Sequence, residues 1–209
     1  MKEVIQKNYK LSWALSLTLV SILALLFAAC NNTNLDDIKS IPKVEEDVNQ
    51  RQIYVKDIAY RFSTQTTFNS VPTKVPTNIK LVLWDNSYQE VDYYFFRKFN
   101  NWFKDMLFNQ GIQSLGENGE ALDCENYSML YKSTMSIANY KSGQKKEIAV
   151  GLVVVRQDYE FAGIPANSGL HMLNLVLTKR GWFIFEPQTN EFILLEDYPN
   201  QEAIQYIIF

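Results

Sequence analysis

The chain is poor in the two residue types that most often carry nucleophilic or metal-binding chemistry. Its 209 residues include a single histidine, His171, and two cysteines, Cys30 and Cys124. A zinc site is disfavoured, because one cysteine and one histidine 47 positions apart do not supply the usual set of ligands. Serine chemistry would need the same histidine, and the sequence has no recognisable nucleophile elbow. Thiol chemistry in the folded part would therefore have to use Cys124 and His171.

The sequence also lacks a basic patch. The whole chain has 20 Lys and Arg against 23 Asp and Glu, which gives a net charge of −3. The first 29 residues contain three lysines and one glutamate, so 17 basic and 22 acidic residues remain after them, a net charge of −5. An acidic chain of this kind is not expected to bind nucleic acid.

The first 29 residues have the organisation of an export signal. Three lysines precede an uncharged apolar run at 11–27, and two alanines stand directly before Cys30. This resembles a bacterial lipoprotein signal, in which the cysteine is lipidated, although Phe27 stands where leucine is commoner. A plain transmembrane anchor is the alternative, since residues 11–29 are just long enough to span a bilayer. Either way, we expect attachment to the cell membrane or outer membrane, facing outside the cytoplasm.

Three regions are expected along the chain: a signal peptide at 1–29, a polar tether at 30–52 and one folded domain at 53–209. A disulfide framework is not expected, because Cys124 has no partner once Cys30 is lipidated. Turn signals and apolar patterns predict strands near 53–62, 78–84, 147–155, 170–178, 182–187 and 191–195, and helices from 85–87 to about 109 and from 124 to 140. The predicted fold class is α+β, with N-terminal helices packed on an antiparallel sheet.

Cys124 begins the second predicted helix, with Asp123 as its N-cap. A thiol in this position lies at the positive end of the helix dipole, which favours the reactive thiolate. An imidazole within reach stabilises the thiolate further and later protonates the leaving group. A third polar group then holds the imidazole in the correct tautomer. His171 lies on a predicted strand, and the next strand supplies the third group.

The hairpin between these strands limits the choice of the third group. His171 lies opposite Gln188 if Lys179–Arg180 forms the turn, and opposite Asn190 if Arg180–Gly181 does. Both registers keep Glu186, Gln188 and Asn190 on the face of His171. We prefer Glu186, because a carboxylate stabilises an imidazolium more strongly than an amide does.

Three segments carry a resemblance to a known family. The run 122–128 (LDCENYS) resembles the helix start of transglutaminase-like and papain-like cysteine peptidases. The runs 171–176 (HMLNLV) and 181–189 (GWFIFEPQT) are similar to segments of papain-like domains such as the C-terminal domain of a mushroom agglutinin. The resemblance covers about residues 81–197. It implies a papain-like or transglutaminase-like fold, with Cys124 as nucleophile, His171 as base and Glu186 as orienting group.

An acyl-transfer site also needs donors for the developing oxyanion. The backbone N–H of Cys124 is the first candidate and Gln113, 11 residues upstream, is the second. No cofactor or metal is expected for the reaction itself. Asp123 and Glu125 most simply cap and charge the first helical turn, and a calcium ion beside them is the alternative.

These observations predict a membrane-anchored cysteine hydrolase outside the cytoplasm that acts on a peptide or protein through a Cys124 thioester. Two alternatives stay open. One is a cell-wall amidase that cleaves peptidoglycan, although the usual D-C-S-G start of that branch is absent here. The other is a non-catalytic binding lipoprotein of the same fold. The sequence does not distinguish hydrolysis from transamidation.

Overall fold

A computed structural model describes residues 40–43, 52–58, 74–76, 78–112 and 123–209. The chain divides into two units, Met1–Ile41 and Pro42–Phe209, and the fold below is that of the second. The signal peptide, Cys30 and Gln113 lie outside the described residues, as does most of the tether. Within the described ranges, no helix is both long enough and apolar enough to cross a membrane.

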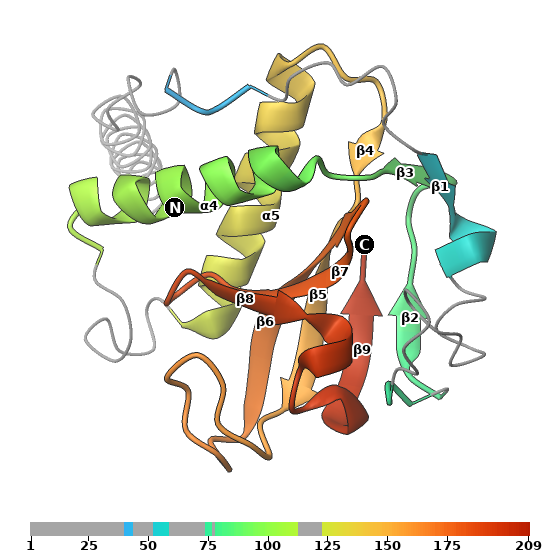
Figure 1. The fold of residues 1–209 in the computed structure, drawn as a ribbon, viewed down its shortest axis with the longest axis vertical. Helices are drawn as coiled ribbons and strands as arrows, with labels where there is room; N and C mark the ends of the chain where they lie inside the picture. The colour runs from blue at the N-terminus through green and yellow to red at the C-terminus, as the bar shows by residue number, and fades with distance from the viewer. Residues whose placement is uncertain (1–39, 44–51, 59–73, 77, 113–122) are drawn as a thin grey trace, which may run out of the picture. The chain divides into compact units, whose positions relative to one another are not determined.

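A six-stranded mixed sheet forms the centre of this unit (Figure 1). Its strands, in spatial order, are β2 (Lys80–Val82), β9 (Ile204–Ile208), β5 (Val150–Arg156), β6 (Leu170–Thr178), β7 (Gly181–Glu186) and β8 (Glu191–Leu194). All neighbours are antiparallel except β2 and β9, which run parallel. The largely apolar composition of β5, β6 and β7 fits their burial in the middle of the sheet.

A second, three-stranded sheet is built from short segments distant in sequence. It contains β1 (Gln52–Tyr54), β3 (Ser87–Gln89) and β4 (Glu147–Ile148), in the order β1-β3-β4. β3 pairs antiparallel with β1 and parallel with β4. Because β4 directly precedes β5, this small sheet is continuous in the chain with the central one.

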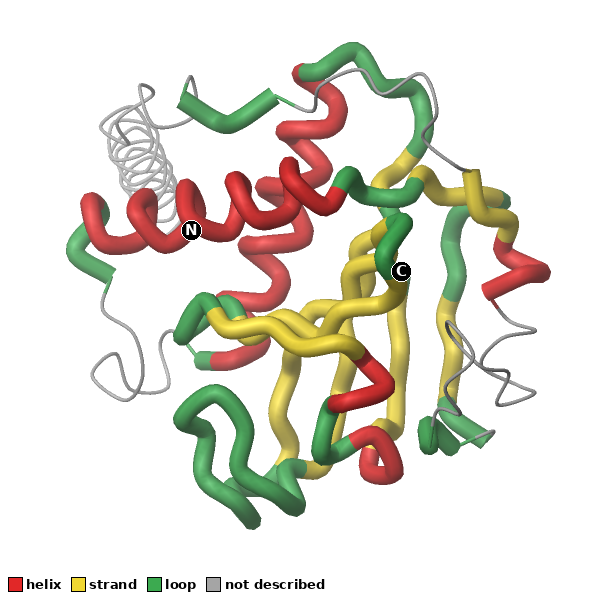
Figure 2. The backbone as a smooth tube through the Cα atoms, in the orientation of Figure 1, coloured by secondary structure: helices red, strands yellow, loops and turns green. Residues whose placement is uncertain are grey.

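Two helices, α4 (Tyr93–Asn109) and α5 (Cys124–Lys141), cross each other on one face of the central sheet (Figure 2). Asp92 caps α4 by accepting a hydrogen bond from the backbone N–H of Phe95 at 2.8 Å. Asp123 and Asn126 form a capping box at the start of α5, each side chain accepting from the other's backbone N–H. The start of α5 is therefore fixed by its own sequence.

Aromatic side chains hold the two helices to the sheet. Phe96 of α4 contacts the rings of Phe183 and Phe185 on β7, with centroids 5.7 and 6.0 Å away. Tyr131 of α5 lies 4.4 Å from Phe185 and 5.4 Å from Phe99 of α4. These aromatic side chains of both helices therefore form part of the core.

The opposite face of the sheet is also buried. Side chains alternate along a strand, so residues such as Leu173 and Trp182 point away from the helices. They belong to an apolar cluster with Tyr88 and Phe209. Two short 3₁₀ segments, η2 (Leu195–Asp197) and η3 (Gln201–Ala203), contribute Leu195 to the cluster and Ala203 at its edge. Both faces of β6 and β7 are thus covered.

The expected arrangement of N-terminal helices on an antiparallel sheet is wrong. The described part of the chain contains nine strands and two long helices, and β1, β2 and β3 all precede α4. The central sheet is mixed because β2 pairs in parallel with β9. The expected cap at residues 85–87 is also wrong, since Ser87 begins β3 and Asp92 caps α4.

Candidate functional site

Cys124 is the first residue of α5. Its thiol is free and partly exposed. The first backbone N–H groups of a helix have no partner within the helix, and the role of the Cys124 N–H as an oxyanion donor stays a prediction. Gln113, the predicted second donor, lies outside the described residues, and its role stays a prediction.

His171 is the second residue of β6 and is only 7% exposed. It pairs with Val155 on β5, whereas pairing of β6 with β7 starts further along, at Asn174 and Phe185. His171 therefore lies at the end of the sheet where β6 and β7 have separated. Strand alternation points its side chain to the same face as Leu173.

Glu186, the last residue of β7, is completely buried and meets the imidazole. The Nε2–H of His171 donates to Oε2 of Glu186. The other carboxylate oxygen, Oε1, accepts the backbone N–H of Gln188 at 2.9 Å. Both oxygens of the carboxylate are thus used, and the imidazole is held with its Nδ1 atom available to a second partner.

The candidate for this second partner is the Cys124 side chain, which is near enough to the imidazole to influence its pKa. Burial alone would lower the pKa of His171, but its hydrogen bonds to Cys124 and Glu186 and the negative charge on both raise the pKa from 6.5 to about 9. At neutral pH the imidazole is therefore protonated. A protonated imidazole between a thiol and a carboxylate is the arrangement required for a thiolate–imidazolium pair.

The hairpin takes the first of the two predicted registers. Thr178 pairs with Gly181, so Lys179–Arg180 forms the two-residue turn. Gln188, an alternative third group, contributes its backbone N–H to Glu186. Asn190, the other alternative, has a φ of 65° and donates its N–H to the backbone carbonyl of Glu186 at 2.9 Å. Both residues shape the turn that holds Glu186.

Asp123 and Glu125 have the simpler of their two expected roles. Asp123 accepts the N–H of Asn126 as an N-cap, and Glu125 lies in the first turn of α5. Across the described ranges, no three His, Cys, Asp or Glu side chains come together as a metal site. The suggestion of a calcium ion here is left untested.

The structure also brings together two buried polar residues whose roles the sequence did not indicate, Ser128 on α5 and Asn174 on β6. Ser128 Oγ donates to the backbone carbonyl of Met172 at 2.9 Å, and Asn174 Nδ2 donates to the carbonyl of Ser128 at 3.0 Å. The sequence offered one signal for them: Ser128 follows Cys124 by about one helical turn, and Asn174 follows His171 by three positions. Only the fold shows that they bond across the same interface.

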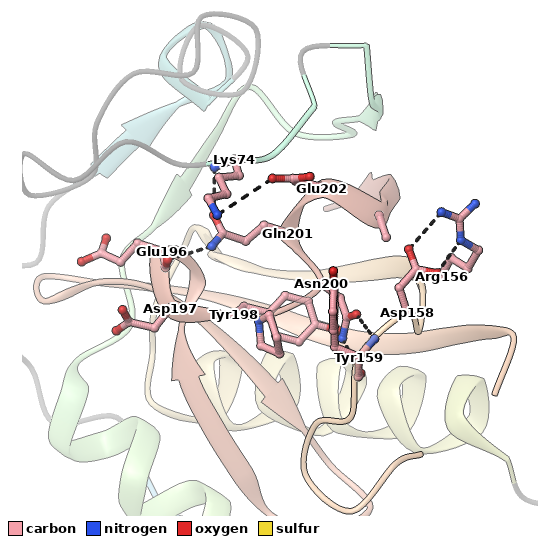
Figure 3. A pocket seen from close by; sticks show the side chains of 12 residues that line it. Lys74, Arg156, Asp158, Tyr159, Glu196, Asp197, Tyr198, Asn200, Gln201 and Glu202 are labelled. Carbon is pink, nitrogen blue, oxygen red and sulfur yellow. Dashed lines mark hydrogen bonds and ion pairs between the residues drawn. The ribbon is translucent and has the colours of Figure 1, made fainter. Parts of the chain in front are cut away.

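A second candidate site is a polar pocket of about 540 Å³ at the opposite end of β5 from β4 (Figure 3). It is lined by Lys74, by residues just after β5 and by the segment from η2 to η3. Arg156 forms a bidentate ion pair with Asp158 at 2.7 and 2.9 Å. Asn200 fixes Tyr159 by accepting its N–H at 2.7 Å and donating to its carbonyl at 2.9 Å.

This pocket offers both an aromatic surface and carboxylates. The side chain of Tyr159 is 64% exposed, and Glu196 and Asp197 lie together on one side of the view in Figure 3. Desolvation raises the pKa of Glu196, and the neighbouring charge of Asp197 raises it further. The pocket combines residues from three distant segments, which explains why no sequence motif marked it.

Comparison with known proteins gives a fold likeness only. No family model matches the chain, and no curated protein matches it at a significant level. Among solved structures, Polyporus squamosus lectin bound to Neu5Aca2-6Galb1-4GlcNAc has a TM-score of 0.51 at 13% identity, over 76% of this chain and 49% of that chain. A structure described as "PSL1a-E64 complex" has a TM-score of 0.49 at 13% identity, over 76% and 51%. This chain spans about half the length of each.

These findings correct the family assignment. The likeness with a TM-score of 0.51 is to a protein named as a lectin, not to one named as a papain-like or transglutaminase-like peptidase. On this finding the family prediction is wrong, together with the papain-like fold class and the thiol-protease and hydrolase descriptions that followed from it. The contacts among Cys124, His171 and Glu186 are a separate observation, because they do not depend on any family.

Proposed function

We propose that Cys124, His171 and Glu186 form a nucleophilic thiol site for acyl transfer. The observation that carries the proposal is the imidazole of His171, which is hydrogen-bonded to the buried carboxylate of Glu186 and lies near the Cys124 side chain. The helix start favours the thiolate, and the buried carboxylate favours the imidazolium. Each residue has the neighbour that its role requires.

In the proposed reaction, the Cys124 thiolate attacks an amide carbonyl and forms a carbon–sulfur bond. The carbon–nitrogen bond then breaks, and the imidazolium of His171 gives its proton to the departing amine. An incoming nucleophile then attacks the thioester carbonyl while His171 accepts its proton, and the carbon–sulfur bond breaks, so that the acyl group is transferred and the Cys124 thiolate is restored. Glu186 keeps the imidazole oriented and stabilises its positive charge throughout.

A peptide or peptidoglycan amide is the proposed substrate, and release of new amino groups is the direct readout. Wild-type protein is expected to release them from purified peptidoglycan or from a mixture of peptides, and Cys124→Ala is expected to release none. Release that is equal in Cys124→Ala, or no release by the wild type from either material, contradicts the proposal.

A second candidate function is carbohydrate binding in the polar pocket, in line with the binding alternative. It is supported by the chemistry of the lining and by the fold likeness to a lectin. The exposed ring of Tyr159 offers an apolar surface with a polar tip. The carboxylates of Glu196 and Asp197 are acceptors for sugar hydroxyl groups.

Calorimetric titration with soluble peptidoglycan fragments tests the pocket, with Neu5Aca2-6Galb1-4GlcNAc as a second probe. Binding is expected in the wild type and in Cys124→Ala, and it is expected to be lost in Tyr159→Ala. Tyr140→Ala is the control, because Tyr140 is 80% exposed and lies on α5, outside the pocket. Equal binding by Tyr159→Ala, or no binding by the wild type, would count against the pocket.

Membrane attachment through a lipid on Cys30 is proposed from the signal sequence alone. The full-length chain is expected in the membrane fraction, and Cys30→Ser is expected to lose the mass of the lipid on its N-terminal peptide. An unmodified Cys30 in the full-length protein would exclude the lipid anchor.

A further inference from the structure

We propose that Ser128 and Asn174 are positioning residues that hold the start of α5 at the end of β6, so that the Cys124 sulfur meets the His171 ring. This inference rests on the proposed thiol site. It assigns to the two residues a role beyond packing, namely the alignment of two groups that come from different layers of the fold.

The need for alignment follows from the placement of the pair. Cys124 belongs to the helical layer, whereas His171 projects from β6 to the same face as Leu173, away from the helices. The two side chains can come together because the helix begins near the end of the sheet, where β6 has separated from β7. A slide of α5 by one turn, about 5.4 Å, would remove the contact.

The two hydrogen bonds act at the points nearest to the pair. Ser128 lies four positions after Cys124, on the same side of the helix, and its hydroxyl donates to Met172, the residue next to His171. Asn174 returns a bond to the carbonyl of Ser128 and makes a longer one, 3.4 Å, to the carbonyl of Gly151 on β5. The helix start is thereby tied to both central strands.

The cost of Asn174 supports a role beyond packing. Ser128 and Asn174 are both fully buried, and the Oδ1 atom of Asn174 has no hydrogen-bond partner within the described ranges. An unpaired buried acceptor destabilises a protein. An apolar residue would fill this position without that penalty, but it would also release the start of the helix.

Alkylation of Cys124 by iodoacetamide tests the inference, with the modified peptide quantified by mass spectrometry. The readout is the ratio of the rate at about pH 6, where only a paired thiol is ionised, to the rate at about pH 10, where any thiol is. Ser128→Ala and Asn174→Ala are expected to lower this ratio by roughly tenfold or more, since a thiol that has lost its imidazolium partner is ionised far less at about pH 6.

Ser136→Ala is the matched control. Ser136 lies on the same helix and also bonds outside it, to Glu147, but it is three turns away from Cys124. This variant is expected to keep the wild-type ratio. Thermal unfolding of each variant, followed by circular dichroism, establishes whether it is folded at the assay temperature. If Asn174→Ala is not folded, Ser128→Ala, which is the smaller change, is used for the test.

The outcomes separate the two proposals. A wild-type ratio that depends on His171, together with unchanged ratios in Ser128→Ala and Asn174→Ala, overturns the positioning role and leaves the thiol site standing. A wild-type ratio that is the same in His171→Gln overturns the thiol site itself, and the positioning role with it.

Discussion

The carboxylate of Glu186 accepts the Nε2–H of His171 with one oxygen and the backbone N–H of Gln188 with the other. The bond to Gln188 fixes the carboxylate within the turn that follows β7. His171 is therefore oriented by a buried charge whose own position is set by the backbone. Removal of this charge is therefore expected to change the protonation of His171.

Replacement of Glu186 by glutamine is expected to lower the pKa of His171 from about 9. Glutamine can still accept the Nε2–H, but it carries no negative charge to stabilise the imidazolium. The chain has one histidine, so an NMR titration of its ring protons reports His171 alone. A wild-type pKa near the ordinary 6.5, or no change in Glu186→Gln, would disagree with the described contacts.

The raised pKa also predicts how stability depends on pH. The native state holds the His171 proton more tightly than the unfolded chain does, so this contribution is complete below about pH 6.5 and is lost as the pH rises through about 9. Urea unfolding of the wild type should show a fall in the free energy of unfolding across this window. His171→Gln should lack that part of the fall, and parallel curves for the two proteins would refute the linkage.

The aromatic layer between the helices and the sheet predicts a large stability effect at Phe96. This side chain is completely buried and contacts rings on β7 and β8. Phe96→Ala is expected to lower the free energy of unfolding by about 3–5 kcal/mol. Phe108, on the same helix, is 79% exposed, so Phe108→Ala should change it by about 0.5 kcal/mol or less. Equal losses in urea unfolding would mean that α4 is not packed as described.

The sequence predicted those parts of the site that depend on local signals. Asp123 and Asn126 determine where α5 begins, and the bounds of β6, Leu170–Thr178, follow from its composition and the turn after it. These signals act over a few residues, so they place Cys124 and His171 in their elements.

The rest depends on contacts between distant segments. Strand β9 and the pairing of Ser87–Gln89 with β1 and β4 were not predicted, because strands this short take their structure from their partners. The bond between Ser128 and Met172 likewise spans 44 positions. The family resemblance did not supply these long-range contacts, and the comparison with solved structures corrected the family assignment itself.

The rate of Cys124 alkylation as a function of pH tests the central claim most directly. We predict that Cys124 reacts rapidly at about pH 6 in the wild type and at a much lower rate in His171→Gln, because a paired imidazolium favours the reactive thiolate. A folded wild-type protein whose Cys124 resists alkylation at about pH 6, or reacts there no faster than in His171→Gln, would contradict the account.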